Sequence, residues 1–224
     1  VTNIIEKQKS RNHTENMLLQ NSDVLKIKKN KKGTNYIKVY GKNYLDPLKI
    51  DVAGDPSSAA FFTALTLLTK NAFLKIKHVG LNPRRIGFYD LLRKHGAKIK
   101  FKNVKKINQE LVGDIHVQSS KLKPINANSN YYVSSTDEYP ILFIIAALTK
   151  GKSIFKGIED LANKESNRIK EMEKMAEASS SPVPFPMDLG GGGRRKKRKK
   201  TKRRRRTKKK KREVRRTKKL SNGK

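Results

Sequence analysis

Hydrophobic and polar residues alternate along this chain with periods that predict a series of short helices and strands. Near the start, the pattern favours a helix at residues 13–20, followed by strands at 24–28 and 36–40. The next segment, SSAAFFTALTLL, is apolar at most positions, which predicts a buried helix. Asp55 is placed to cap this helix, and Pro56 suits its first position.

A second group of elements follows. AFLKIKHVG alternates as a strand does, IGFYDLLRKHG has the spacing of an amphipathic helix that Gly96 ends, and AKIKF and DIHVQ predict further strands. The same order then recurs, because a Leu-Thr-Lys ending closes one apolar helix at Lys70 and another at Lys150, 80 positions later. A strand follows each ending, at residues 73–79 and 153–158, and then a loop and a helix. This recurrence predicts an internally repeated α/β architecture.

The end of the chain has a different composition. The formal net charge is +35, and residues 194–224 hold 22 Lys and Arg against one acid, Glu213. Residues 177–193 are rich in Ser, Pro and Gly and read as a linker. We expect residues 194–224 to form a disordered basic tail, because so charged a segment buries no core.

Composition also excludes several kinds of site. The chain has no cysteine, so it holds no disulfide, no thiolate metal site and no cysteine nucleophile. Its four histidines lack the spacing of metal ligands. The longest apolar run, residues 141–148, is far shorter than the roughly 20 residues of a membrane-spanning helix, which predicts no membrane partner.

Two stretches place charged side chains at the start of a helix. In SSTDEYP, Asp137 precedes a buried helix and suits a general base beside a substrate hydroxyl, although Ser135 and Glu138 also fit a plain capping box. In NKESNR, a helix beginning near Lys164 sets Lys164 and Arg168 on one face and pairs Glu165 with Arg168. That arrangement predicts an anion site with a proton donor, and the alternative is an ordinary solvated helix start.

A third stretch, KSRNHTENML, joins a hydroxyl and a guanidinium. Ser10 and Arg11 directly precede the helix expected at residues 13–20, which is an arrangement suited to binding phosphate. A simple cap formed by Asn12 or Thr14 explains the same residues. Each of the three stretches taken alone therefore leaves both interpretations open.

The order of these motifs along the chain decides between the functional and the capping interpretations. The motifs are SRNHTENML, DVAGDPSSAAFF, VGLNPRRIGFYDLLRKHGAKI, DIHVQSSKLK, TDEYPILFIIAAL and NKESNRI. In this order and spacing the chain resembles the 5-enolpyruvylshikimate-3-phosphate synthase family, and in particular its bacterial class with SRDHTE and RVKESDR motifs. The resemblance covers about residues 4–175 and excludes the tail.

The resemblance implies a fold of two inside-out α/β barrels, each built from three βαβαββ units, with the active site between them. On this map, residues 1–53 finish one barrel domain and residues 54–176 supply two units of the other, so the enolpyruvyl transferase fold is incomplete. The family transfers the enolpyruvyl group of phosphoenolpyruvate to the 5-hydroxyl of shikimate 3-phosphate, a step of chorismate and aromatic amino acid biosynthesis. The family implies a cytoplasmic monomer and no metal or organic cofactor.

The resemblance also assigns roles to residues of this chain. By motif, Asp137 is the base that takes the proton of the 5-hydroxyl, and Glu165 is the acid for proton transfer at the phosphoenolpyruvate methylene. Lys164 contacts shikimate 3-phosphate and Arg168 holds phosphoenolpyruvate. Ser10 binds the shikimate phosphate, with Arg11 as a second contact.

Departures from the family pattern matter too. Ala162 and Asn167 stand where the usual motif has arginine and aspartate. The family's other substrate motifs fall outside this chain, so we expect no appreciable activity from this polypeptide alone.

Two other functions remain open. The sister enzyme UDP-N-acetylglucosamine enolpyruvyl transferase shares the fold, although KES-x-x-R and SRNHTE favour the shikimate enzyme. The tail predicts non-specific binding of nucleic acid or nuclear localisation if it is genuine. Its Gly, Arg, Lys and Glu all have purine-only codons, so residues 190–219 also fit a frameshifted or misassigned purine-rich tract.

Overall fold

The computed structural model describes residues 1–7, 10–20, 23–31, 33–41, 44–163 and 166–180, without the side chains of 179 and 180. These residues all belong to one unit, Val1–Val183. The predicted basic tail, and most of the predicted linker, lie outside the described residues. The predicted domain boundary after residue 53 stays a prediction.

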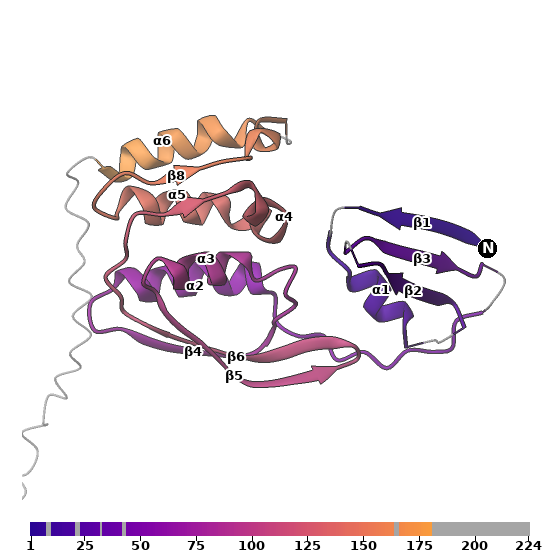
Figure 1. Ribbon diagram of the computed structural model, residues 1–224. Helices are drawn as coiled ribbons and strands as arrows, with labels where there is room; N and C mark the ends of the chain where they lie inside the picture. The colour runs from indigo at the N-terminus through magenta and orange to yellow at the C-terminus, as the bar shows by residue number, and fades with distance from the viewer. Residues whose placement is uncertain (8–9, 21–22, 32, 42–43, 164–165, 181–224) are drawn as a thin grey trace, which may run out of the picture. The chain divides into compact units, whose positions relative to one another are not determined.

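The first sheet is antiparallel and has three strands. Strands β1 (Thr2–Glu6), β3 (Asn35–Val39) and β2 (Leu25–Lys29) pair in this order, and helix α1 (His13–Leu18) connects β1 to β2 (Figure 1). The predictions of α1, β2 and β3 are confirmed to within two residues. Strand β1 was not predicted, because its single apolar pair, Ile4 and Ile5, gives no alternation and both side chains are exposed.

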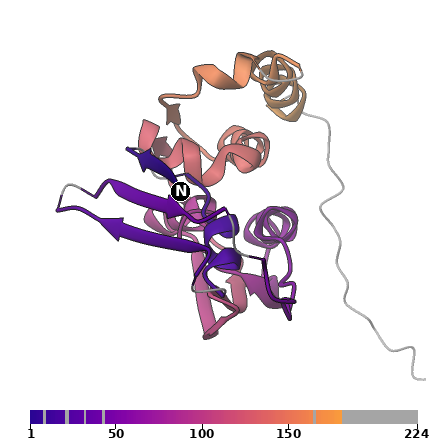
Figure 2. The same cartoon turned by 90° about the vertical axis from the view of Figure 1, so that its right-hand side faces the viewer.

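The second sheet is also antiparallel, in the order β4 (Phe73–Gly80), β6 (Glu110–Gln118), β5 (Lys98–Ile107). Helices α2 (Pro56–Leu68) and α3 (Gly87–Lys94) lie on one face of this sheet in both views (Figures 1 and 2). Asn108 and Gln109 join β5 to β6 with positive φ angles of 48° and 65°, as the tightest hairpin turns require. This turn fixes the place of Glu110, the first residue of β6.

The second repeat is built from shorter pieces. It begins with strand β7 (Asn126–Ala127), which pairs in parallel with β8 (Ile154–Phe155). Between them lie η1 (Ser129–Tyr131), α4 (Tyr132–Ser135), η2 (Thr136–Glu138) and α5 (Tyr139–Ala147). After β8 come η3 (Glu159–Asn163) and α6 (Arg168–Ser180). The sequence order helix, strand, helix therefore occurs twice, as predicted.

The structure confirms the predicted start of one helix and contradicts the predicted start of another. The Asp55 side chain accepts a hydrogen bond of 2.8 Å from the Ser58 backbone N–H, so the predicted cap of α2 is confirmed. The prediction of a helix beginning near Lys164 is wrong, since Ser166 and Asn167 are not helical and α6 begins at Arg168. Asn167 takes the capping position instead, because its side chain accepts from the Lys170 N–H at 3.2 Å.

The core lies between the second sheet and the helices. Its fully buried side chains include Phe88, Tyr89, Leu91, Leu92, Ile115, Leu142 and Ile145. Helix α2 presents small residues such as Ala60 and Ala64 to this core, whereas Phe61, Phe62 and Leu65 are 56–63% exposed. The prediction that α2 is buried is therefore confirmed for one side of the helix and wrong for the side with these three residues, because only one stripe of the helix meets the sheet and α5.

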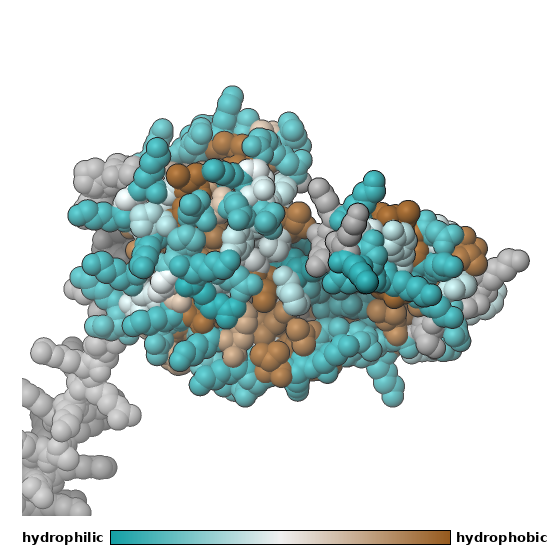
Figure 3. All heavy atoms as spheres, in the orientation of Figure 1, coloured by the Kyte–Doolittle hydropathy of each residue, from teal (hydrophilic) through white to brown (hydrophobic). Residues whose placement is uncertain are grey.

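The face shown in Figure 3 is mainly hydrophilic, with hydrophobic side chains gathered in small groups among the polar ones. Among the described residues, no helix has both the length and the apolar character needed to span a bilayer.

Candidate functional site

The candidate base and one candidate phosphate ligand meet directly. Arg11 Nη2 donates to Asp137 Oδ2 at 2.5 Å, although the two residues lie 126 positions apart in the sequence. Both side chains are 42% exposed, so water reaches the pair. An exposed ion pair of this kind contributes only about 0–1 kcal/mol, and a ligand can separate it at little cost.

Ser10 precedes Arg11 in the chain, and its polar groups contact Glu6. Its backbone N–H and its hydroxyl both donate to Glu6 Oε1, at 2.9 and 2.8 Å. Burial acts to raise the pKa of Glu6, but the hydrogen bonds from Ser10 and Asn35 and the nearby Arg84 charge together hold it below its ordinary value. A carboxylate that stays ionised therefore lies directly beside the predicted phosphate-binding hydroxyl.

Asp137 lies in the short η2 turn, where its own side chain is exposed and the next residue is buried. Its neighbour Glu138 is 1% exposed and accepts a 2.5 Å hydrogen bond from the Ser57 hydroxyl. Burial raises the pKa of Glu138, and the charge of Asp137 adds to this, against the opposing effects of Ser57 and Arg85. The turn thus sends one carboxyl to solvent and the next into the protein.

Neither of the two helix-capping interpretations, the box at Ser135 and Glu138 or the cap at Asn12, describes these residues. The predicted capping box is not formed, since Ser135 Oγ donates to the Tyr131 carbonyl and Glu138 accepts from Ser57. Asn12 holds the N-cap position of α1 without a capping hydrogen bond. Its side chain instead bonds to Asn16 and Asn82.

The remaining predicted residues come from the segment around α6. Lys164 and Glu165 lie outside the described residues. Arg168 is the first residue of α6, and its charge acts to lower the pKa of Tyr132, although burial and the hydrogen bond to Asp160 raise that pKa overall. The structure therefore brings Arg11 and Asp137 together, with Ser10 next to Arg11 in the chain, and places the Arg168 charge near Tyr132.

Sequence reasoning missed the residues that surround the site. Asn82, Arg84 and Arg85 lie between β4 and α3 and reach Asn12, Ser10 and Ser57 through their side chains. Two adjacent arginines after Asn-Pro, in a loop between a strand and a helix, were the available signal. Glu6 and Glu110 had no such signal in the sequence, since single acidic residues occur throughout the chain.

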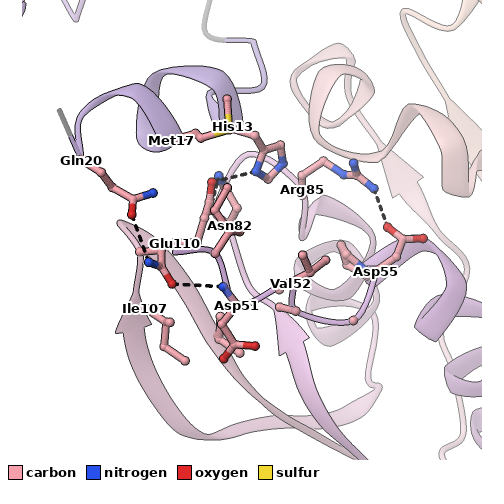
Figure 4. A pocket seen from close by; sticks show the side chains of 17 residues that line it. His13, Met17, Gln20, Asp51, Val52, Asp55, Asn82, Arg85, Ile107 and Glu110 are labelled. Carbon is pink, nitrogen blue, oxygen red and sulfur yellow. Dashed lines mark hydrogen bonds and ion pairs between the residues drawn. The ribbon is translucent and has the colours of Figure 1, made fainter. Parts of the chain in front are cut away.

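A cavity of about 370 Å³ lies beside α1, and Asn82, Arg85 and Glu110 are part of its lining. Its walls include His13 and Met17 from α1, Val52 from the connection between the sheets, and Ile107 and Glu110 from the β5–β6 hairpin (Figure 4). Its lining does not include Ser10, Arg11 or Asp137, so the cavity is not the predicted site. Among the described residues, no three His, Asp or Glu side chains gather as metal ligands.

Comparison with known proteins identifies relatives over most of the chain. Residues 1–177 match the family model of EPSP synthase (3-phosphoshikimate 1-carboxyvinyltransferase). The 3-phosphoshikimate 1-carboxyvinyltransferase of Novosphingobium aromaticivorans is 39% identical over 183 residues, which is 82% of this chain and 42% of that protein. The enzyme of the same name from Petrotoga mobilis is 41% identical over 174 residues, 77% of this chain and 39% of that protein.

Comparison with solved structures agrees with the comparison of sequences. EPSP synthase from Acinetobacter baumannii superposes with a TM-score of 0.68 and 33% identity, over 77% of this chain and 38% of that chain. The fold is therefore that of an incomplete enolpyruvyl transferase. The chain spans about two-fifths of the length of the curated relatives that it matches.

Proposed function

This chain belongs to the EPSP synthase family, and on that premise we propose that it supplies the shikimate 3-phosphate side of an enolpyruvyl transferase active site. The observation that carries the proposal is the contact between Arg11 and Asp137 beside Ser10. A phosphate ligand and a base that are distant in sequence meet at one solvent-exposed place. An anionic substrate with a reactive hydroxyl matches this combination.

The proposed reaction assigns a role to each group. Asp137 takes the proton of the 5-hydroxyl, whose oxygen adds to C2 of phosphoenolpyruvate while Glu165 serves proton transfer at the methylene carbon. Protonation turns that methylene into a methyl group, and elimination then removes a proton from the methyl group and breaks the C2–O bond to phosphate, leaving the enolpyruvyl ether. Lys164 contacts shikimate 3-phosphate, and Arg168 holds phosphoenolpyruvate. The reaction is balanced without a redox step or cofactor.

The electrostatics favour the phosphate end of the substrate. Arg11 has five N–H donors and reaches the site from a half-exposed position, so it can exchange Asp137 for a phosphate group. Ser10 adds a hydroxyl that is able to turn from Glu6 towards an anion. Separation of the Arg11–Asp137 pair on substrate binding also leaves Asp137 free to accept a proton.

Calorimetric titration of shikimate 3-phosphate into the full chain tests the proposal. We expect binding that Arg11→Ala weakens by about tenfold or more, equivalent to about 1.4 kcal/mol. Arg93→Ala is the matched control, because Arg93 is an exposed arginine paired with Asp90 on α3, away from Ser10. Equal affinity of wild type and Arg11→Ala, or no binding by either, contradicts the proposal.

A further inference from the structure

The loop between β4 and α3 has a fixed backbone. The Arg84 N–H donates to the side-chain oxygen of Asn82 at 2.9 Å, and the Arg85 N–H donates to the Asn82 carbonyl at 2.8 Å. Asn82 is only 4% exposed, so this turn is anchored inside the protein. Its three polar side chains leave the loop in different directions, and each one reaches a segment next to the candidate site.

Arg84 reaches the segment that carries Ser10. Its Nη1 donates to the Ser10 carbonyl at 2.6 Å and lies 3.3 Å from Glu6 Oε1. The same Glu6 oxygen accepts the Ser10 backbone N–H and hydroxyl. The Arg84 and Glu6 side chains are 20% and 12% exposed, so solvent screens their charges only in part. A bare carboxylate here repels a phosphate group, and Arg84 offsets that charge.

Asn82 holds the other side of Arg11. Its Nδ2 donates to Asn12 Oδ1 at 2.9 Å and to Glu110 Oε2 at 3.1 Å. Glu110 in turn accepts from Asn16 at 3.0 Å and lies 2.8 Å from His13 Nδ1, and Figure 4 shows the His13, Asn82 and Glu110 side chains converging. The residues before and after Arg11 are therefore both held by one loop.

Arg85 connects the loop to the opposite side of the site. Its Nη2 donates to Ser57 Oγ at 2.7 Å and to Asp55 Oδ1 at 3.1 Å. Ser57 passes the contact on by donating to Glu138, the residue after Asp137. Residues 82–85 of this loop thus contact the segment that carries Arg11 and, through Ser57, the turn that carries Asp137.

We propose that the loop formed by residues 82–85 is the positioning element of the substrate site, and that Arg84 sets the place of Ser10 and neutralises Glu6 beneath the bound phosphate. Arg84 acts through Ser10 and Glu6 and is a positioning residue. The inference rests on the proposed function for its ligand. The contacts by which the loop holds residues 10–19 are independent of that function.

A double-mutant cycle of charge-neutralising variants tests the electrostatic part. Arg84→Gln is expected to weaken shikimate 3-phosphate binding by about tenfold, and the double variant Glu6→Gln with Arg84→Gln to regain most of that loss. Arg93→Gln is the control for removing one positive charge elsewhere. A purely structural role of Arg84 predicts no recovery in the double variant. Unchanged affinity in Arg84→Gln, or no recovery in the double variant, overturns this part of the inference.

Hydrogen exchange provides a readout that needs no substrate. The backbone N–H groups of Asn16 and Leu19 bond to Asn12 and Glu15 within the α1 segment. We expect Arg84→Gln to speed their exchange by about tenfold while amides of β6 keep their rates. If wild type fails to bind shikimate 3-phosphate but the exchange effect is present, the proposed function fails and the positioning role stands. Unchanged exchange overturns the positioning role even where substrate binds.

Arg84→Lys guards against a folding defect. It keeps the positive charge near Glu6 but replaces the planar guanidinium that contacts Ser10. Should Arg84→Gln not fold, Arg84→Lys is expected to fold and to bind more weakly than wild type. Binding and exchange equal to wild type in Arg84→Lys overturn the assignment of the Ser10 contact.

Discussion

The hydroxyl of Ser57 donates a hydrogen bond of 2.5 Å to the carboxyl of Glu138, which is buried one residue beyond Asp137. This bond joins the first turn of α2 to the η2 turn, across 81 positions of sequence. It explains why an acid is tolerated there, because a buried carboxyl without a partner destabilises a fold by several kcal/mol. The arrangement has a consequence for pH dependence.

Glu138→Gln is expected to change how stability depends on pH. Burial raises the pKa of Glu138 above its ordinary 4.5, so the folded protein holds this proton more tightly than the unfolded chain does. Wild type therefore has the full contribution of this proton below pH 4.5 and loses it as pH rises through the folded-state value. The stability of wild type relative to Glu138→Gln should fall from pH 4 to pH 7. Denaturant unfolding at each pH measures this, and parallel curves refute it.

Asp55→Ala should destabilise the chain by about 1–2 kcal/mol, since it removes the cap of α2 and the partner of Arg85. Burial acts to raise the pKa of Asp55, but the hydrogen bonds from Ser58 and Ser57 and the Arg85 charge lower it below 3.8. The stabilisation is thus present above pH 3.8 and fades as pH falls further. Asp90→Ala, which removes only an exposed ion pair with Arg93, serves as control. Equal unfolding midpoints for the two variants would argue against the capping role.

Two buried tyrosines should respond differently to loss of the hydroxyl. Tyr89 donates to the Pro56 carbonyl at 2.6 Å, so Tyr89→Phe should cost about 1 kcal/mol and strand a buried acceptor. The Tyr139 hydroxyl is buried without a hydrogen-bond partner among the described residues, so Tyr139→Phe should cost almost nothing. Thermal unfolding compares them. A larger loss for Tyr139→Phe would show that the hydroxyl contacts are misassigned.

Gly87→Ala tests the contact between α3 and α4. A Cβ at Gly87 overlaps the Ser134 side chain and approaches its backbone carbonyl carbon at 3.1 Å. Because backbone cannot yield as a side-chain end does, we expect a loss of about 1–3 kcal/mol. Gly41→Ala is the control, since nothing lies within 4 Å of a Cβ there. An unfolding midpoint of Gly87→Ala equal to that of Gly41→Ala would contradict this packing.

Local sequence patterns were enough to predict much of the fold. Asp55 and Gly96 act locally, through a cap and a positive φ of 97°, so sequence spacing was enough to place them. The start of α6 was misplaced because residues 163–168 carry no apolar period, and charge spacing alone does not fix where a helix begins. The exposure of Phe61 and Phe62 depends on which elements pack against α2, and helix periodicity cannot supply that information.

The candidate site, like the fold, was predictable from the sequence only in part. Ser10, Arg11 and Asp137 were predicted through the motifs of the family that the chain resembles, and the order of the motifs implied that they belong to one site. The supporting contacts of Arg84 to Ser10 and of Ser57 to Glu138 span 74 and 81 positions. Such contacts depend on the folded topology, so no local pattern in the sequence announces them.

Mapping of amide shifts by ¹H–¹⁵N NMR during titration with shikimate 3-phosphate tests the central claim most directly. We predict that the largest changes fall on Ser10, Arg11 and Asp137, and that Arg11→Ala needs at least about tenfold more ligand to produce those at Ser10 and Asp137, whereas Arg93→Ala does not. The same titration reports on residues 194–224, whose many cations attract any phosphate. Changes confined to that segment, or an unaltered spectrum around Ser10 and Asp137, would contradict the account.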